Sequence, residues 1–207
     1  MATRLEFHPV TPERWDDMVQ LFGPRGACAG CWCMWPRVRG GEFARIKGDG
    51  ARRRMRAIVA GGGTPGILAY AGDEPVGWCA VAPRAVFLRL ESSRVMAAVD
   101  DQPVWSVPCL FVAREWRGRG VPARLLGAAA RFAAARGARV LEGYPIDTEG
   151  KRQADAFLWH GVRSMFVRAG FREVARRSAT RPIMRKALRA TASATPQRKT
   201  RTAVSRG

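Results

Sequence analysis

The sequence lacks any apolar run long enough to cross a membrane. No stretch in its 207 residues approaches the roughly 20 apolar residues of a membrane-spanning helix. Residues 1–9 also lack the apolar segment of a secretory signal. We therefore expect a cytoplasmic protein that has no membrane partner.

Cysteine is scarce, and its number is odd. The five cysteines are Cys28, Cys31, Cys33, Cys79 and Cys109. An odd number in a chain without a secretion signal argues against a disulfide framework. The spacing Cys28-x-x-Cys31-x-Cys33 is compatible with a zinc site in which His8 or Cys79 is the fourth ligand. However, no second Cys-x-x-Cys or His pair completes such a set of ligands. The sequence therefore predicts no metal site and favours a loop of sulfur and aromatic groups that packs or lines an acceptor pocket.

Acidic residues are few. The chain has 17 Asp and Glu against 36 Lys and Arg, a net charge of +19. A positive field attracts nucleotides, nucleic acid or acidic membranes without choosing among them. From residue 185 onwards there are seven basic residues and no acidic residue. We expect one domain at residues 1–186 and a disordered basic tail at residues 187–207.

Apolar periodicity and turn residues predict an α/β domain. Strands are expected at 4–10, 66–71, 76–82, 107–112 and 140–144 and in runs up to 183. Helices are expected at 11–22, 42–60, 122–136 and 156–168. Loops are expected at 23–41 and 145–154, with an irregular excursion at 83–103.

The segment after the strand at 107–112 is suited to hold a phosphate. Gly118 and Gly120 allow a tight turn and a close approach of the backbone to a ligand, and Pro122 suits the first turn of the following helix. Free amides and the helix dipole favour an anion at that point. Three arginines add positive charge to the same rim: Arg117, Arg119 and Arg124.

A dinucleotide-binding site is one alternative for this segment. Gly118-x-Gly120-x-x-Ala123 matches the glycine pattern of such sites, and Glu142 follows where their ribose-binding acid would stand. However, five residues separate the strand from the first glycine, and too few structured residues follow for a doubly wound sheet. The context argues for a different phosphate-containing ligand.

The segment resembles a known motif. Val112-x-x-x-Trp116-Arg117-Gly118-Arg119-Gly120-Val121-Pro122 looks like the acyl-CoA motif Arg/Gln-x-x-Gly-x-Gly/Ala of the GCN5-related N-acetyltransferases (GNAT), with Pro122 in place of the last Gly or Ala. Residues 73–78 and 166–171 resemble two further parts of that family, in its order. The resemblance implies a GNAT-like α/β fold. Its mixed, mostly antiparallel sheet would have helices on both faces and a splayed parallel strand pair that forms the acyl-CoA cleft.

The resemblance also implies acetyl transfer from acetyl-CoA, the co-substrate, to a primary amine. The strands near 107–112 and 140–144 would form the cleft. Backbone groups of Leu110, Phe111 and Val112 would hold the pantetheine arm, and an amide near Val112 would stabilise the oxyanion. The pyrophosphate would lie against the next segment: Arg117, Gly118, Arg119, Gly120, Val121, Ala123 and Arg124.

Tyrosine is nearly absent, and this affects the catalytic assignment. The family's tyrosine that protonates the leaving thiolate falls at position 166, which is Phe166. We predict Tyr144 and Glu142 as the catalytic pair, since they lie two residues apart and so on one face of the cleft strand. Both residues also have a structural interpretation: Tyr144 as a half-buried aromatic residue of the strand, and Glu142 as the partner of an arginine in an ion pair. His160 is a third candidate, and direct transfer without a dedicated acid is a further alternative.

The acceptor is expected to be a small cationic molecule, because Asp147, Glu149 and Asp155 lie in or beside the loop after the cleft strand.

Cys109 could take part in a covalent route through an acyl-cysteine, but we favour its interpretation as a small buried residue of the strand. The alternative function is an acetyltransferase or a non-catalytic module that acts on an aminoacyl-tRNA or a basic protein through its positive surface. The oligomeric state, including a homodimer, stays open.

Overall fold

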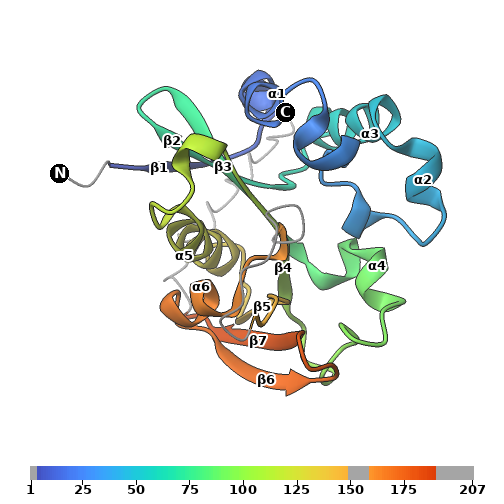
Figure 1. Ribbon diagram of the computed structural model, residues 1–207, viewed down its shortest axis with the longest axis vertical. Helices are drawn as coiled ribbons and strands as arrows, with labels where there is room; N and C mark the ends of the chain where they lie inside the picture. Colours follow the sequence, from blue (N-terminus) through green and yellow to red (C-terminus); the bar gives the residue numbers. More distant parts are fainter. Residues whose placement is uncertain (1–3, 149–158, 190–207) are drawn as a thin grey trace, which may run out of the picture.

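The protein is built around one seven-stranded sheet (Figure 1). The computed structural model describes residues 4–148 and 159–189. The strands are β1 (Glu6–Pro9), β2 (Gly66–Ala71), β3 (Glu74–Pro83), β4 (Trp105–Val112), β5 (Val140–Gly143), β6 (Arg172–Arg176) and β7 (Pro182–Ala187). They lie in the order β1-β2-β3-β4-β5-β7-β6, and the pairing is antiparallel except between β4 and β5. The predicted mixed, mostly antiparallel sheet is therefore confirmed.

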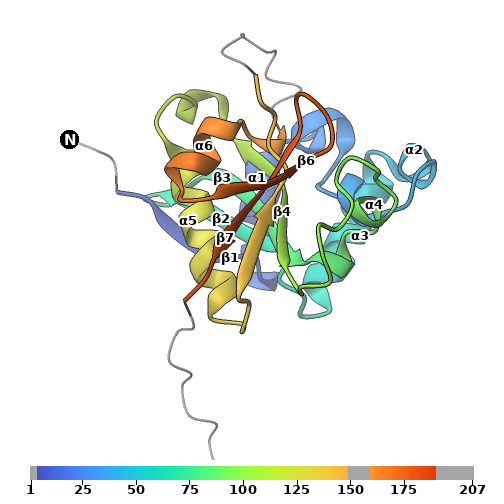
Figure 2. The ribbon, with the colours of Figure 1, turned by 90° about the horizontal axis from the view of Figure 1, so that it is seen from below.

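Helices cover both faces of the sheet. They are α1 (Trp15–Phe22), α2 (Glu42–Ile46), α3 (Asp49–Ala60), α4 (Leu88–Glu91), α5 (Val121–Ala134) and α6 (Arg163–Arg168). Figure 2 shows α5 and α6 on one side of the sheet and α3 and α4 on the other. The helix α5 packs on β2, β3 and β4 because Leu125, Leu126, Ala129 and Ala133 form one fully buried apolar face.

The long helix expected at 42–60 is broken, and the expectation of one continuous helix was wrong. Lys47 is extended (φ −48°, ψ 139°), and Gly48 has a left-handed φ of 84°. The Gly48 N–H donates to Gly30 O at 2.9 Å, so the break is tied to the preceding loop. A backbone hydrogen bond from outside the helix therefore separates α2 from α3.

The segment around α6 also differs from the prediction. Val162 is extended and forms a parallel bridge with Ile146, so α6 begins at Arg163. The first part of the helix expected at 156–168 lies outside the described residues. So does most of the tail expected from residue 187, although β7 runs to Ala187. The domain boundary stays a prediction.

Candidate active site

The turn between β4 and α5 has the backbone shape of an anion-binding site. A short 3-10 turn spans Arg114–Trp116, and α5 begins at Val121. Gly118 (φ 73°) and Gly120 (φ 74°) are both left-handed, and in the described part of the chain no heavy atom beyond the adjoining residues lies within 4 Å of a Cβ built on either. The turn therefore leaves room for a ligand against its backbone, at the positive end of the α5 dipole.

The three predicted arginines are exposed on this turn. Arg117 Nε donates to Val112 O at 3.2 Å. The Arg119 guanidinium lies 5.0 Å from the centre of the Trp116 ring, and Arg124 lies on the first turn of α5. The turn thus combines open backbone with fixed positive charge, which matches a pyrophosphate.

The parallel strands β4 and β5 separate beside this turn. They pair only from Trp105↔Leu141 to Val107↔Gly143, where β5 ends. β4 continues to Val112, paired with β3 on its other edge. The β5-facing edge of β4 beyond Val107 is therefore not covered by β5. The predicted pantetheine-binding residues lie on this part of β4: Leu110, Phe111 and Val112.

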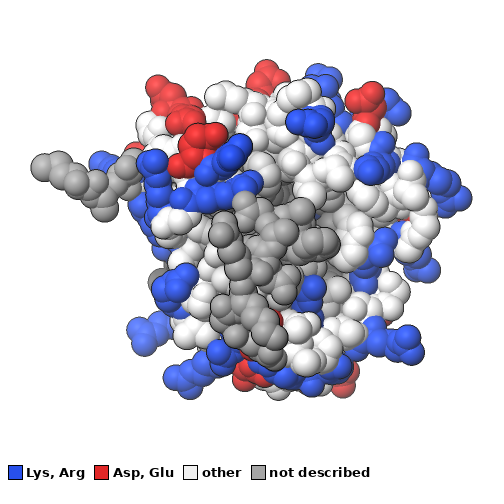
Figure 3. Space-filling view, in the orientation of Figure 1, with Lys and Arg blue, Asp and Glu red and all other residues white. Residues whose placement is uncertain are grey.

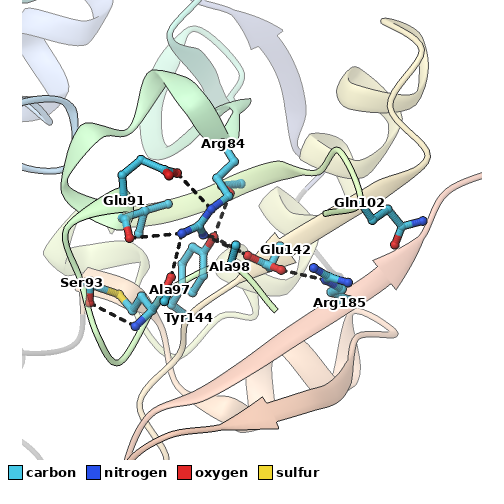
Figure 4. Close-up of polar contacts among 12 residues, drawn as sticks. Arg84, Glu91, Ser93, Ala97, Ala98, Gln102, Glu142, Tyr144 and Arg185 are labelled. Carbon is cyan, nitrogen blue, oxygen red and sulfur yellow. Dashed lines mark hydrogen bonds and ion pairs between the residues drawn. The ribbon is translucent and has the colours of Figure 1, made fainter. Parts of the chain in front are cut away.

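Glu142 and Tyr144 lie in a buried polar cluster with Arg84 (Figure 4). The Tyr144 hydroxyl donates to Glu142 Oε1 at 2.6 Å, and Arg84 Nη1 donates to the same oxygen at 3.2 Å and to the Tyr144 hydroxyl at 2.6 Å. Arg185 Nε donates to Glu142 Oε2 at 2.7 Å, and Ser106 Oγ lies 2.9 Å from the Tyr144 hydroxyl. Both Glu142 and Tyr144 are 0% exposed. The cluster is therefore a closed network in which both carboxylate oxygens face a cation.

This network raises the cost of proton transfer by Tyr144. Burial, and then the negative charge of Glu142, hold the pKa of Tyr144 far above its usual value of 10. The contacts match the ion-pair alternative for Glu142. The predicted catalytic roles of Glu142 and Tyr144 remain predictions.

An apolar pocket of about 200 Å³ opens between the loop at 23–41 and β4. Four of its lining residues carry thiols: Cys28, Cys31, Cys33 and Cys109. Five are aromatic: Phe22, Trp35, Phe43, Phe111 and Trp159. The residues that line it carry no charge, and they include Leu110 and Phe111 of the open strand. The pocket therefore adjoins the predicted position of the pantetheine arm and suits an apolar group.

Of the three acidic residues expected to bind a cationic acceptor, the structure describes Asp147 alone. Arg176 Nη2 donates to Asp147 Oδ2 at 2.8 Å, so that carboxylate is already paired. Glu149 and Asp155 lie outside the described residues.

His160 lies buried beside the open edge of β4, with 4% of its surface exposed. Its side chain hydrogen-bonds to the backbone of Pro108, while Nδ1 has no partner among the described residues. The nitrogen bound to the carbonyl must carry the proton, so Nδ1 carries the lone pair. Burial, and then the charge of Arg181, hold the pKa of His160 well below 6.5. His160 is thus a buried neutral imidazole beside β4, with an acceptor nitrogen that has no partner among the described residues.

The cysteines do not form a metal centre within the described residues. All five are free, and no group of three or more His, Cys, Asp or Glu side chains in the described ranges is arranged to hold a metal ion. The described helices also include none that is long and apolar enough to span a membrane.

An open parallel strand pair beside a glycine turn is the arrangement of an acyl-CoA-binding transferase. The family model for the acetyltransferase (GNAT) family matches residues 30–155, more than half of the chain. The chain belongs to this family of acetyltransferases. No sequence among the curated proteins matches it significantly.

Solved structures share the fold. A putative GNAT-family acetyltransferase from Desulfovibrio desulfuricans aligns with a TM-score of 0.51 at 16% identity, over 89% of this chain and 99% of that chain. A GNAT-family acetyltransferase from Listeria monocytogenes gives 0.52 at 12% identity, over 89% and 95%. The PaiA N-acetyltransferase from Thermoplasma acidophilum, solved in complex with coenzyme A, gives 0.50 at 13% identity, over 89% and 99%. At these identities the likeness shows the fold alone.

Two buried arginines were missed by the sequence analysis. Arg84 and Arg37 are 9% and 8% exposed. Arginine is rarely buried, so the sequence around Arg84 does not indicate that its side chain is buried. For Arg37, the apolar neighbours Pro36 and Val38 are the one local indication of burial.

Proposed function

We propose that the protein transfers the acetyl group of acetyl-CoA to the nitrogen of a primary amine. The observation that carries this proposal is the edge of β4 beyond Val107, which β5 does not cover. This part of β4 leads into the glycine turn and contributes Leu110 and Phe111 to the apolar pocket. An extended pantetheine arm would bond to the backbone of Leu110, Phe111 and Val112, and an amide there would stabilise the oxyanion. Along this edge, acetyl-CoA would lie toward the glycine turn, and the amine would enter from the apolar pocket.

The pyrophosphate end would be held by the turn. The open backbone around Gly118 and Gly120 allows close approach, and the exposed arginines supply charge. The residues we assign to this task are Arg117, Gly118, Arg119, Gly120, Val121, Ala123 and Arg124.

We propose an amine with an apolar or aromatic body as the acceptor. Aromatic rings bind alkyl and aryl groups, and they also attract an ammonium through their π faces. This keeps the cationic small molecule that the sequence favoured but replaces the acidic loop by the aromatic wall of the pocket.

The amine must lose a proton during transfer, and we assign this proton to His160. Nδ1 of this ring is an acceptor without a partner among the described residues. The other ring nitrogen donates to the backbone of Pro108 and so fixes the ring beside β4. Glu142 and Tyr144 would then hold β5 in place rather than exchange protons, because their network is closed.

The test is product formation, measured as N-acetylated amine by mass spectrometry. Phenylethylamine is expected to be acetylated faster than ethanolamine at equal concentration, since only the former has an apolar body. His160→Gln is expected to lower turnover by about 100-fold. If acetyl-CoA binds and no primary amine is acetylated, the assignment of an amine acceptor fails.

A second candidate is an acetyltransferase or a non-catalytic module that acts on an aminoacyl-tRNA or a basic protein through its positive surface. Figure 3 shows Lys and Arg side chains spread around much of one face, with Asp and Glu gathered at few places. Four arginines of α3 are exposed: Arg52, Arg53, Arg54 and Arg56. Arg54 is paired with Glu42, and Arg52 lies over the ring of Trp32, so part of this charge is already engaged.

A further inference from the structure

Two tryptophans that meet edge to face form one wall of the apolar pocket. Trp35, in the loop at 23–41, and Trp159, just before α6, both line the pocket, and their ring centres lie 4.7 Å apart at an interplanar angle of 75°. Both residues are half-buried, whereas Phe22 and Leu110 in the same lining are buried. The two tryptophans therefore lie on the solvent side of the pocket, where an entering molecule meets them first.

Trp35 is held in place by Arg89 of α4, which belongs to the excursion after β3. Arg89 Cζ lies 4.2 Å from the centre of the Trp35 ring, and Arg89 Nε donates to Trp35 O at 3.2 Å. The face of a tryptophan ring attracts a guanidinium, and the hydrogen bond fixes the backbone of the same residue. One side chain thus holds both the ring and the backbone of Trp35.

A second arginine makes the reverse contact between the same two segments. Arg37, two residues after Trp35, places Cζ 4.8 Å from the ring centre of Phe87, the residue before α4. Arg37 is 8% exposed and Phe87 is 0% exposed, and Arg37 Nη2 also donates to Pro65 O at 2.8 Å. The pocket loop and α4 are therefore joined by two arginine–ring contacts in opposite directions, which keep the wall of the pocket in one position.

The volume of the pocket limits the apolar body of an acceptor to one ring. A cavity of about 150 Å³ in another protein binds benzene, and this pocket measures about 200 Å³, so it has room for one six-membered ring and a short chain. Aromatic pairs gain stability beyond the burial of their area. The wall therefore favours an aromatic ring over a saturated ring of the same size.

The same wall leads to the group assigned to the amine proton. The ring centre of His160 lies 3.6 Å from that of Trp159 and 6.1 Å from that of Trp35. An aromatic ring bound against the two tryptophans would therefore keep a short amine chain near His160.

We propose that the acceptor is a primary amine on a short chain from a single aromatic ring, and that Trp35 selects this ring. The inference rests on the proposed function, which brings the acceptor into this pocket. Trp35 touches the acceptor and determines specificity. Arg89 acts through Trp35 and is a positioning residue.

The experiment compares phenylethylamine with 2-cyclohexylethylamine on the full-length protein at saturating acetyl-CoA. The saturated ring is the more apolar of the two, so burial alone would favour it. The wild type should instead prefer phenylethylamine by about threefold to tenfold in kcat/KM, as expected for a contact between aromatic rings. Arg89→Gln should reduce this preference to less than about twofold, through a higher KM for phenylethylamine at a nearly unchanged kcat.

Arg136→Gln is the matched control. Arg136 Cζ lies 3.6 Å from the ring centre of Phe132, and Arg136 Nη1 donates to Phe132 O at 3.3 Å, so the same two contacts occur at the C-terminal end of α5. This variant should keep the wild-type preference. Trp35→Phe should keep part of the preference, and Trp35→Leu should abolish it. The preference is a ratio of two rates of one preparation, so a partly unfolded variant still gives a valid value.

The outcomes separate this inference from the proposed function. Equal kcat/KM of the wild type for both amines, or the wild-type preference in Arg89→Gln, would overturn the inference and leave the proposed function standing. An equal loss of preference in Arg136→Gln would also overturn it, because the effect would then not come from Trp35. Binding of acetyl-CoA without acetylation of any primary amine would remove the proposed function, and this inference with it.

Discussion

At the scale of single residues, Arg84 determines how the excursion after β3 is attached to the sheet. Its Nη2 donates to Leu90 O at 3.1 Å and to Met96 O at 2.9 Å, while its Nη1 binds Glu142 and Tyr144 on the other side. A guanidinium has five donors in a plane, so one side chain can satisfy all these acceptors. The excursion and β5 are therefore joined through one buried cation.

Removing the Tyr144 hydroxyl tests whether this cluster is structural. Tyr144→Phe should lower the free energy of unfolding by roughly 1–3 kcal/mol, because it leaves buried polar partners unsatisfied. Tyr70→Phe is the matched control, since its hydroxyl donates to Asp17 at 2.6 Å in a part-buried position. Urea unfolding measures both. An unchanged unfolding free energy with a large loss of turnover would instead support the predicted catalytic role of Tyr144.

The buried imidazole of His160 predicts a pH dependence of stability. Its pKa is held well below 6.5 in the folded state, so below about pH 6.5 the unfolded chain binds a proton that the folded chain does not. Stability is fully present above this pH and falls by up to about 1.4 kcal/mol per pH unit as the pH drops toward the folded-state pKa. His160→Gln should remove this slope in urea unfolding between about pH 7 and 5. Equal slopes for both proteins would show that His160 is not buried as a neutral ring.

At the scale of elements, the end of β5 is packed directly against α6. A Cβ added to Gly143 would overlap Phe166 Cε1. Phe166 is 0% exposed and also meets the ring of Phe171 at 5.0 Å. The ring at the position of the family's tyrosine is therefore a packing residue here.

A pair of glycine substitutions tests this contact. Gly143→Ala should destabilise the protein by about 1–3 kcal/mol through overpacking. Gly127→Ala should instead stabilise it by up to about 1 kcal/mol, because it lies in α5 with its nearest neighbour 3.8 Å away. Thermal unfolding of both variants checks the opposite signs. Equal effects would contradict the packing of Phe166 on β5.

Local patterns in the sequence were sufficient to predict several elements. The helix expected at 122–136 forms at Val121–Ala134, because its alanine and leucine spacing defines one apolar face. The turn before it was predicted from Gly118 and Gly120, since only glycine adopts their backbone freely. The antiparallel neighbours β2 and β3 followed from the turn residues between them.

Contacts between distant segments could not be predicted in the same way. Cys33 meets Cys109 and Trp78 only because the loop at 23–41 packs on the centre of the sheet. Arg84 reaches Glu142 only because strand order places β5 beside β4. Both pairings depend on register and topology, which no local pattern encodes.

At the scale of the whole molecule, the net charge of +19 separates the two candidate functions. Between about 50 and 200 mM salt, a protein with six to ten phosphate contacts loses on the order of a thousandfold or more in nucleic-acid affinity. Turnover of a small amine at saturating acetyl-CoA should change by less than about twofold over this range, since no Asp, Glu, Lys or Arg among the described residues lines the pocket. A steep salt dependence of that turnover would favour an acceptor bound through the surface charge.

Isothermal titration with acetyl-CoA tests the central claim most directly, with Gly120→Trp and Gly137→Trp as a matched pair. Both glycines are left-handed and open to solvent, but Gly120 precedes α5 in the proposed phosphate site and Gly137 follows the far end of the helix. We predict that the wild type and Gly137→Trp bind acetyl-CoA and that Gly120→Trp does not. Failure of the wild type to bind, or undiminished binding by Gly120→Trp, would contradict the assignment of the acyl-CoA site.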